Sequence, residues 1–296
     1  MPTLSGNAEQ FNANGWTAST NVWNPGRYQN GEDFTQTISA QSGDFPNNTK
    51  ITWNWPYDSN RPLNYANFPV RAYPELIYGA DPWSKGPSST VDLPAKISDV
   101  KNLDISYDFG ITGDKNLYNV AFSLWISDDP AKGLQGVTDE VMVWVHTGYF
   151  SPAGQEVAKI QDKNGPATLW NKKDFSGGVE GNPVDWEYTV MQYNKDLLAG
   201  TIDLDALLKN LADRGIVDRN DWILGVQVGA EVTAGRGSLD VKKLAVDFVG
   251  PPPAPSAPME TAAAVVAPPQ QQPASGAANT LLPTQDSGVT APPTVT

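Results

Sequence analysis

Short runs of alternating apolar and polar residues recur along the first 250 residues, and they restrict the fold more than any other feature of this chain. Successive side chains of a strand point to opposite faces of a sheet, so strict alternation indicates a strand with one buried face. The clearest runs are 51–55, 103–109, 120–126 and 139–146, and further strands are expected near 34–39, 70–78, 157–161, 168–171, 186–193 and 239–249. Glycine, proline and asparagine separate these runs. The pattern predicts an all-β protein, a jelly-roll β-sandwich of two antiparallel sheets.

One segment has a helical period instead. Between residues 203 and 215 the leucines recur three and four positions apart, with Asp203 as the expected N-cap and Gly215 as the expected C-cap. We expect one short helix that packs against the sandwich and carries no catalytic residue.

The composition divides the chain near residue 250. From 251 to 296 there is no aromatic residue, no Lys and no Arg, and eleven of the 46 positions are proline. Such a composition cannot form a core and predicts a disordered, Pro/Ala/Thr-rich tail or linker. Residues 1–250 contain every aromatic residue and suffice for one large β domain.

The charge balance excludes several classes of partner. The formal net charge is −13, from 33 acidic and 20 basic residues, and no basic run is present, so neither nucleic acid nor an anionic membrane is an expected partner. Neutral polysaccharide is indifferent to this charge. The chain has no cysteine and no metal-ligand spacing. Its first residues lack the features of a signal peptide, and we nevertheless expect a secreted protein.

The run at 139–146 has two different faces. One carries only valines, which is typical of a core face. The opposite face carries a carboxylate, a thioether, an indole and an imidazole, from Glu140, Met142, Trp144 and His146. Sugar cleavage needs an apolar platform for the pyranose ring and an acid beside the scissile bond, and this face offers both. At about 3.3 Å per residue, His146 lies too far from Glu140 to act on the same bond, so we interpret it as a surface histidine.

A second run, 225–231, repeats the arrangement. Its polar face carries Gln227 and Glu231, with Gly225 and Gly229 leaving room above the backbone for a ligand. Two acids on the polar faces of otherwise apolar strands are the minimum for glycosidic hydrolysis. The same pattern fits two glutamates that simply face solvent, because a polar outer face is the normal state of an antiparallel sheet. In the run at 51–55, Trp53 and Trp55 share a face with an isoleucine and are expected in the core.

Six segments carry a family resemblance: 21–24 (Asn-Val-Trp-Asn), 51–55 (Ile-Thr-Trp-Asn-Trp), 72–74 (Ala-Tyr-Pro), 119–122 (Asn-Val-Ala-Phe), 140–144 (Glu-Val-Met-Val-Trp) and 229–231 (Gly-Ala-Glu). Together they resemble glycoside hydrolase family 12, the retaining endo-β-1,4-glucanases and xyloglucanases with a compact β-jelly-roll fold. The resemblance covers roughly residues 10–250, and the Glu-x-Met-x-Trp segment is its most specific part.

The resemblance implies a role for each matching residue. Glu140 would be the nucleophile and Glu231 the general acid/base. The glucan cleft would be lined by Asn21, Trp23, Met142 and Trp144. Four further substrate-binding candidates lie on the same predicted faces or on a matching segment: Tyr73, Ser123, Trp125 and Gln227. Neither a cofactor nor a metal is expected.

One position departs from the family pattern. The family usually has an aspartate on the strand beside the nucleophile, where this chain has Ser123. A neighbouring carboxylate raises the pKa of a carboxyl group, so the serine is expected to shift the pH optimum or to weaken the enzyme.

These observations lead to one main hypothesis and two alternatives. The main one is a monomeric enzyme that hydrolyses internal β-1,4-glucosidic bonds of β-glucan, xyloglucan or cellulose with retention, using carboxyl groups about 5–5.5 Å apart. The first alternative is a non-catalytic β-glucan-binding module with the same fold. The second is a structural or interaction protein whose tail recruits a partner or joins a further module.

Overall fold

The computed structural model describes residues 2–41, 43–57, 69–84, 86–179 and 182–251. The predicted tail at 251–296 lies outside the described residues, apart from its first residue. The described part is a β-sandwich, as the alternating runs predicted. No helix in it is long and apolar enough to cross a membrane.

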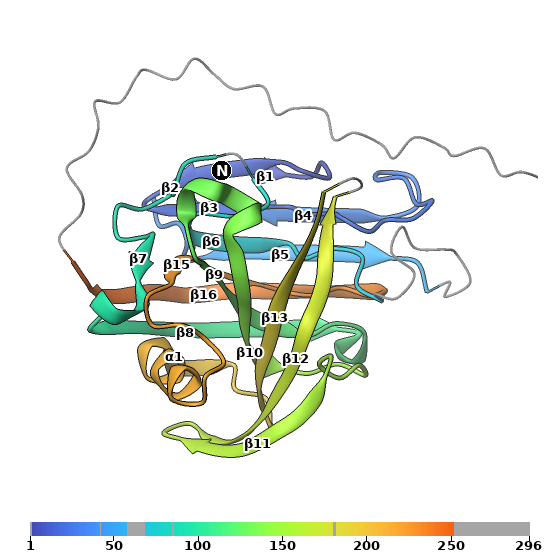
Figure 1. Ribbon diagram of the computed structural model, residues 1–296. Helices are drawn as coiled ribbons and strands as arrows, with labels where there is room; N and C mark the ends of the chain where they lie inside the picture. Colours follow the sequence, from blue (N-terminus) through green and yellow to red (C-terminus); the bar gives the residue numbers. More distant parts are fainter. Residues whose placement is uncertain (1, 42, 58–68, 85, 180–181, 252–296) are drawn as a thin grey trace, which may run out of the picture. The chain divides into compact units, whose positions relative to one another are not determined.

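The smaller layer is a six-stranded sheet in the order β1-β4-β5-β16-β8-β14 (Figure 1). All of its neighbouring strands are antiparallel. Its strands are β1 (Thr3–Leu4), β4 (Thr35–Ser39), β5 (Thr49–Trp55), β8 (Asn102–Gly113), β14 (Ala199–Asp203) and β16 (Gly235–Val249).

The larger layer is a ten-stranded sheet in the order β11-β12-β13-β10-β9-β15-β6-β3-β2, with β7 pairing β15. Its strands are β2 (Gln10–Ala13), β3 (Trp16–Ser19), β6 (Glu75–Gly79), β7 (Ala95–Lys96), β9 (Val120–Ser127), β10 (Val137–His146), β11 (Gln155–Asp162), β12 (Gly165–Val179), β13 (Asn182–Tyr193) and β15 (Trp222–Gly229). Short 3₁₀ turns are η1 (Ile97–Asp99), η2 (Lys115–Leu117) and η3 (Pro130–Gly136).

The expectation of two purely antiparallel sheets is wrong at one place, because β10 and β13 run parallel. After β10 the chain forms the antiparallel pair β11 and β12, and β13 then returns between β12 and β10. Alternation reports which face is buried and carries no information on strand direction. The strand expected at 70–78 is also shorter than predicted, since regular pairing begins at Glu75.

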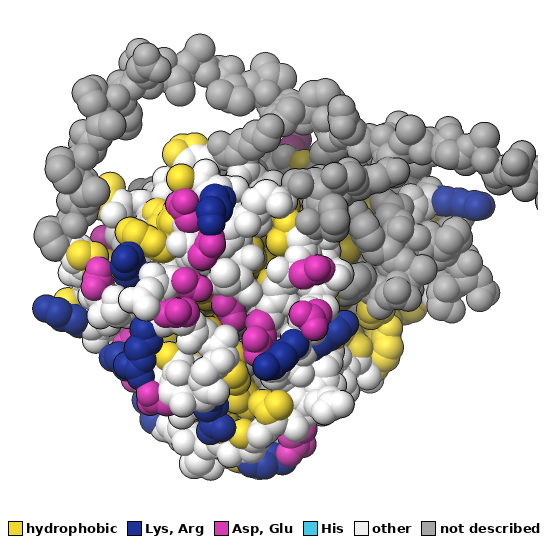
Figure 2. Space-filling model, viewed as in Figure 1, with side chains coloured by type: hydrophobic (Ala, Val, Ile, Leu, Met, Phe, Trp, Pro, Cys, Tyr) yellow, Lys and Arg dark blue, Asp and Glu magenta, His cyan; other side chains and the backbone are white. Residues whose placement is uncertain are grey.

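The core lies between the two sheets. Val141, Val143 and Val145 of β10 are fully buried there, in one cluster with residues of both sheets. Trp53 and Trp55 are buried as predicted, and the ring of Trp55 stacks on Phe34 at 3.7 Å between centroids. In the view of Figure 2 the Lys and Arg side chains are interspersed with acidic ones and form no single patch.

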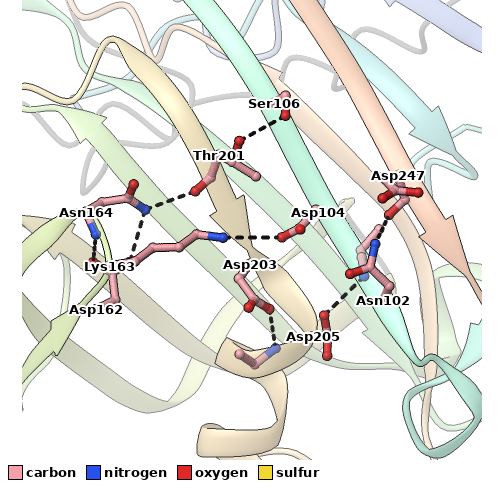
Figure 3. Close-up of polar contacts among 12 residues, drawn as sticks. Asn102, Asp104, Ser106, Asp162, Lys163, Asn164, Thr201, Asp203, Asp205 and Asp247 are labelled. Carbon is pink, nitrogen blue, oxygen red and sulfur yellow. Dashed lines mark hydrogen bonds and ion pairs between the residues drawn. The ribbon is translucent and has the colours of Figure 1, made fainter.

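The predicted helix is present as α1 (Leu204–Asp213), and its four leucines are buried. Asp203 caps it, since the Asp203 carboxylate accepts a hydrogen bond from the Ala206 amide at 2.9 Å. Figure 3 shows how this end of the helix joins the sheet: the Asp205 carboxylate accepts from the backbone amide of Leu103 on β8 at 3.2 Å. The side chains of Ser106 and Thr201 also hydrogen-bond across β8 and β14.

Removing the helix cap should destabilise the fold measurably. We expect Asp203→Ala to lower the free energy of unfolding by about 1 kcal/mol, because the Ala206 amide loses its acceptor. Asp203→Asn is the matched control, since asparagine caps as well as aspartate and only the charge is removed. Equal losses in both variants, measured by denaturant unfolding, would contradict the capping role.

Candidate active site

Strand β10 presents its second face away from the core between the sheets. We call this side of the ten-stranded sheet the outer face. Met142 and Trp144 belong to a separate apolar cluster there, apart from the valines of the same strand. In the sheet register Glu140 lies between Trp125 of β9 and Tyr188 of β13. The two-face pattern predicted for this strand is therefore confirmed from Glu140 to Trp144.

Glu140 is half-buried and held by two neutral donors. The Ser123 hydroxyl donates to Oε1 of Glu140 at 3.0 Å, and the indole nitrogen of Trp186 donates to Oε2 at 3.2 Å. Burial raises the pKa of Glu140 to about 8, and the negative charge of Glu231 acts in the same direction. The two hydrogen bonds oppose this rise, because both favour the ionised carboxylate.

Glu231 is held by Asn119 through both side chain and backbone. The Asn119 amide nitrogen donates to Oε2 of Glu231, while the Glu231 backbone amide donates to the Asn119 side-chain oxygen at 3.1 Å. Burial raises the pKa of Glu231 to about 7, and the Asn119 bond opposes the rise. The predicted strand ends two residues before Glu231, at Gly229. The chain then leaves the regular ladder and bridges to Ala72 and Tyr118 through Val232.

The two glutamates act electrostatically on common neighbours. Burial raises the pKa of Tyr188 and of Tyr73 far above the ordinary tyrosine value, and in both cases the charges of Glu231 and Glu140 add to the rise. Within the described part of the chain, no Lys or Arg forms an ion pair with either glutamate. Among the described residues, the side chains that donate hydrogen bonds to these carboxylates are all neutral.

A line of residues continues from Glu140 across the outer face. In register, Met142 of β10 neighbours Ser123 of β9, which neighbours Gln227 of β15. The indole nitrogen of Trp125 donates to Gln227 Oε1 at 2.9 Å. The structure thus brings five of the predicted substrate-binding residues, Ser123, Trp125, Met142, Trp144 and Gln227, onto the face that carries Glu140.

The surroundings of Trp144 and of the remaining predicted site residues differ. Trp144 is buried, packs edge-on against Phe150, and its indole nitrogen has no hydrogen-bond partner among the described residues. Tyr73 is buried, and its hydroxyl donates to the backbone oxygen of Ala121 at 2.9 Å. Asn21 and Trp23 are half-buried, in the segment that follows β3.

The interpretation of His146 as a surface residue is wrong. Only 5 % of His146 is exposed, and its ring nitrogens lie 2.9 Å from the Asp196 carboxylate and 2.9 Å from the Lys115 backbone oxygen. The pairing of β10 with β9 shifts register between Trp144 and His146. This irregularity interrupts the strict two-face pattern on which the sequence interpretation relied.

Sequence reasoning missed three residues around the glutamates: Trp186, Tyr188 and Glu75. Trp186 and Tyr188 alternate along the run at 186–193, but only the parallel pairing of β13 with β10 brings them beside Glu140. Glu75 is fully buried and its Oε1 accepts from the Asn21 side chain at 2.7 Å, while its Oε2 finds no partner among the described residues. Burial raises the pKa of Glu75 far above the ordinary value, with the charges of Asp81 and Glu140 adding to it.

A large cavity lies apart from these residues. It measures about 610 Å³ and is lined by the start of β10, by Glu187 and by the turn after α1. Its acidic lining includes Asp139, Asp218 and Asp221. In residues 2–251, as far as they are described, no group of three or more His, Cys, Asp or Glu side chains is arranged to hold a metal ion.

The electrostatic link between the glutamates can be measured directly. We expect Glu231→Gln to lower the pKa of Glu140 from about 8, because the charge of Glu231 is removed, and to leave it above 4.5, because burial remains. An NMR titration of the labelled Glu140 carboxyl measures the shift. Glu156→Gln, at an exposed glutamate of β11, is the control. An unchanged pKa in Glu231→Gln would show that the two groups lie too far apart to share a reaction.

Comparison with known proteins places the chain in a family. Residues 14–248 match the family model described as glycosyl hydrolase family 12. Endoglucanase S of Pectobacterium parmentieri is 26% identical over 249 residues, which cover 80% of this chain and 83% of that protein. A family 12 xyloglucanase from Bacillus licheniformis has a similar fold, with a TM-score of 0.71, 19% identity and coverage of 84% of this chain and 100% of that chain.

The catalytic domain of Cel12A from Humicola grisea, solved in complex with a soaked thio cellotetraose, matches with a TM-score of 0.65 and 17% identity, covering 84% of this chain and 99% of that chain. The family match spans most of the sandwich, including Glu140 and Glu231. The chain therefore belongs to glycosyl hydrolase family 12, the family of endoglucanases and xyloglucanases.

Proposed function

We propose that this protein hydrolyses internal β-1,4-glucosidic bonds of a β-glucan with retention of configuration, with Glu140 as nucleophile and Glu231 as general acid/base. One observation carries the proposal. Two half-buried glutamates lie on or beside the outer face, their carboxylates accept hydrogen bonds only from neutral groups among the described residues, and the charge of Glu231 raises the pKa of Glu140. A pair of carboxyl groups that cannot both ionise easily is what glycosidic hydrolysis requires.

The coupling supports a state in which the pair holds one proton. Burial raises the pKa of both groups, so the first proton leaves near neutral pH and the second leaves against the repulsion of the first charge. Glu140 accepts two hydrogen bonds and Glu231 accepts one from a side chain. The pKa of Glu140, about 8, lies above that of Glu231, about 7, because it includes the repulsion of an ionised Glu231. We nevertheless assign the charge to Glu140 and the proton to Glu231 in the reacting complex, because Glu140 has the two donors that stabilise a carboxylate and the reaction needs an ionised nucleophile and a protonated acid.

The reaction then proceeds by double displacement. The Glu140 carboxylate attacks the anomeric carbon while Glu231 protonates the departing glycosidic oxygen. Glu231, now ionised, removes a proton from a water molecule that hydrolyses the glycosyl-enzyme, and Glu140 leaves as the free carboxylate. Retention requires the two carboxyl groups to lie about 5–5.5 Å apart.

Ser123 suits this role as a neutral neighbour. Its hydroxyl donates to Glu140 and adds no negative charge, whereas the aspartate usual in the family would repel the nucleophile. The serine therefore favours ionisation of Glu140 compared with a carboxylate at this position.

The alternative of a non-catalytic β-glucan-binding module shares the fold and the aromatic residues. Binding alone does not need two coupled glutamates, and leaving such groups buried costs stability. The pair therefore favours the enzyme. The relatives named above support a glucan substrate: their descriptions include a xyloglucanase and a complex with a thio cellotetraose.

Product formation by wild type and two variants tests the proposal. Wild type should release reducing ends from carboxymethylcellulose, barley β-glucan or xyloglucan, with the β-anomer appearing first by NMR. Glu140→Ala and Glu231→Ala should each lower kcat by at least about a thousandfold with unchanged folding, because each removes a reacting group. Glu156→Ala, at an exposed glutamate, should keep wild-type rates. Wild-type rates in either site variant would remove that residue from the mechanism.

The leaving group separates the two roles. An aryl cellobioside with an acidic phenol needs little protonation, so Glu231→Ala should retain a substantial part of the wild-type rate on this substrate while losing polysaccharide hydrolysis. Glu140→Ala should gain nothing from the better leaving group, because the nucleophile itself is missing. The kcat/KM for release of the phenol measures both, because it reports the first displacement and excludes the second, in which Glu231 acts as a base. Rescue of Glu140→Ala instead would reverse the assignment.

A further inference from the structure

Three indole rings form a cluster on the outer face, beside Glu140. Trp83 lies in the segment between β6 and β7, and its ring centroid is 5.5 Å from that of Trp125 and 5.8 Å from that of Trp186. Trp125 and Trp186 are themselves 5.5 Å apart. The three rings meet at 71–76°, the edge-to-face geometry that aromatic pairs prefer. We call Trp83, Trp125 and Trp186 the tryptophan cluster.

The members of the cluster differ in exposure. Trp125 and Trp186 are 5 % and 6 % exposed, whereas 42 % of Trp83 is exposed. Trp186 donates to the Glu140 carboxylate, and Trp125 neighbours Glu140 in the sheet register. The exposed ring of Trp83 therefore lies one side chain away from the proposed nucleophile, at the solvent end of an otherwise buried cluster.

Hydrogen bonds tie the Trp83 segment to the same face. The Asp81 carboxylate accepts from the Trp83 backbone amide at 3.0 Å and from the Gln227 side-chain amide at 3.3 Å. Gln227 in turn accepts from the indole of Trp125. These contacts link Asp81, Gln227, Trp125 and Trp83 in a closed ring, which restricts the movement of the Trp83 segment.

Two residues close to Trp83 in the chain line a small polar hollow. Asp81 and Ser84 line a small hollow together with Gln10, Asn12 and Thr17 of strands β2 and β3. An accessible aromatic ring beside amide and hydroxyl groups offers what a sugar needs, an apolar surface for the ring and partners for its hydroxyls. A pre-organised ring also loses little conformational entropy on binding.

We propose that Trp83 is a sugar-binding residue, a platform on which a glucosyl unit of the β-glucan chain packs beside the bond held at Glu140. The inference rests on the proposed function and adds a substrate contact from outside the matched motifs. Asp81 is a positioning residue in this arrangement, since it acts by holding the Trp83 backbone. If Trp83 only packs against Trp186 and binds no sugar, its removal should lower kcat and leave KM unchanged.

Affinity without turnover gives the first test. In the Glu140→Gln background, affinity electrophoresis through gels containing barley β-glucan or xyloglucan measures binding of the full chain. The comparison uses whichever of the two glucans retards the Glu140→Gln parent more strongly. For that glucan we expect Trp83→Ala to raise the Kd at least about fivefold, and Trp83→Phe to keep most of the parent's affinity. Val91→Ala is the control, since it removes another exposed apolar side chain between β6 and β7. Equal retardation of parent and Trp83→Ala, or a parent that neither glucan retards, would overturn the inference.

Kinetics in the active enzyme separate binding from structural support. With that glucan as substrate, Trp83→Ala should raise KM at least about fivefold and change kcat less than about twofold. Asp81→Ala should raise KM in the same direction, and the double variant should add little, because both act through one ring. A fall in kcat with unchanged KM would show that Trp83 only supports Trp186 and Glu140. An inactive wild type that still binds glucan through Trp83 would refute the proposed reaction and leave this binding role standing.

Discussion

The pairing of β10 between β9 and β13 is the constraint on which the site depends. A slip of one residue would turn Glu140 into the core between the sheets and bring a valine to the outer face. The buried valines oppose such a slip, because each would lose its apolar contacts. The pairing of β10 with β9 shifts register before Asp139 and after Trp144. It is regular between these shifts, in the stretch that carries Glu140, Met142 and Trp144.

The second requirement is to hold two carboxyl groups with raised pKa values, and the fold meets it with neutral groups. Ser123 and Trp186 stabilise the Glu140 carboxylate, and Asn119 stabilises Glu231. A lysine or arginine at either place would lower the pKa of the carboxyl group and hold it ionised. Neutral donors leave both pKa values raised, so a single proton can remain on the pair near neutral pH. Glu75 adds a third buried carboxyl group beside Asn21.

The outer face combines parts that are distant in the chain. Trp83 follows β6, Trp125 lies on β9 and Trp186 on β13, yet their rings contact one another. Asp81 connects the first of them to Gln227 of β15. Substrate recognition in this arrangement would depend on a segment outside the strand motifs that identify the family.

The sequence by itself determined the sandwich, the capped helix, the core position of Trp53 and Trp55, and the two faces of β10, because side-chain period and capping chemistry are local properties. It also singled out Glu140 and Glu231, whose roles remain proposals. Only the tertiary structure decided that β13 runs parallel to β10, which brings Trp186 to Glu140, and that His146 is buried against Asp196. Strand order, strand direction and local register shifts arise from contacts between distant segments, and alternation along one strand carries no information about them.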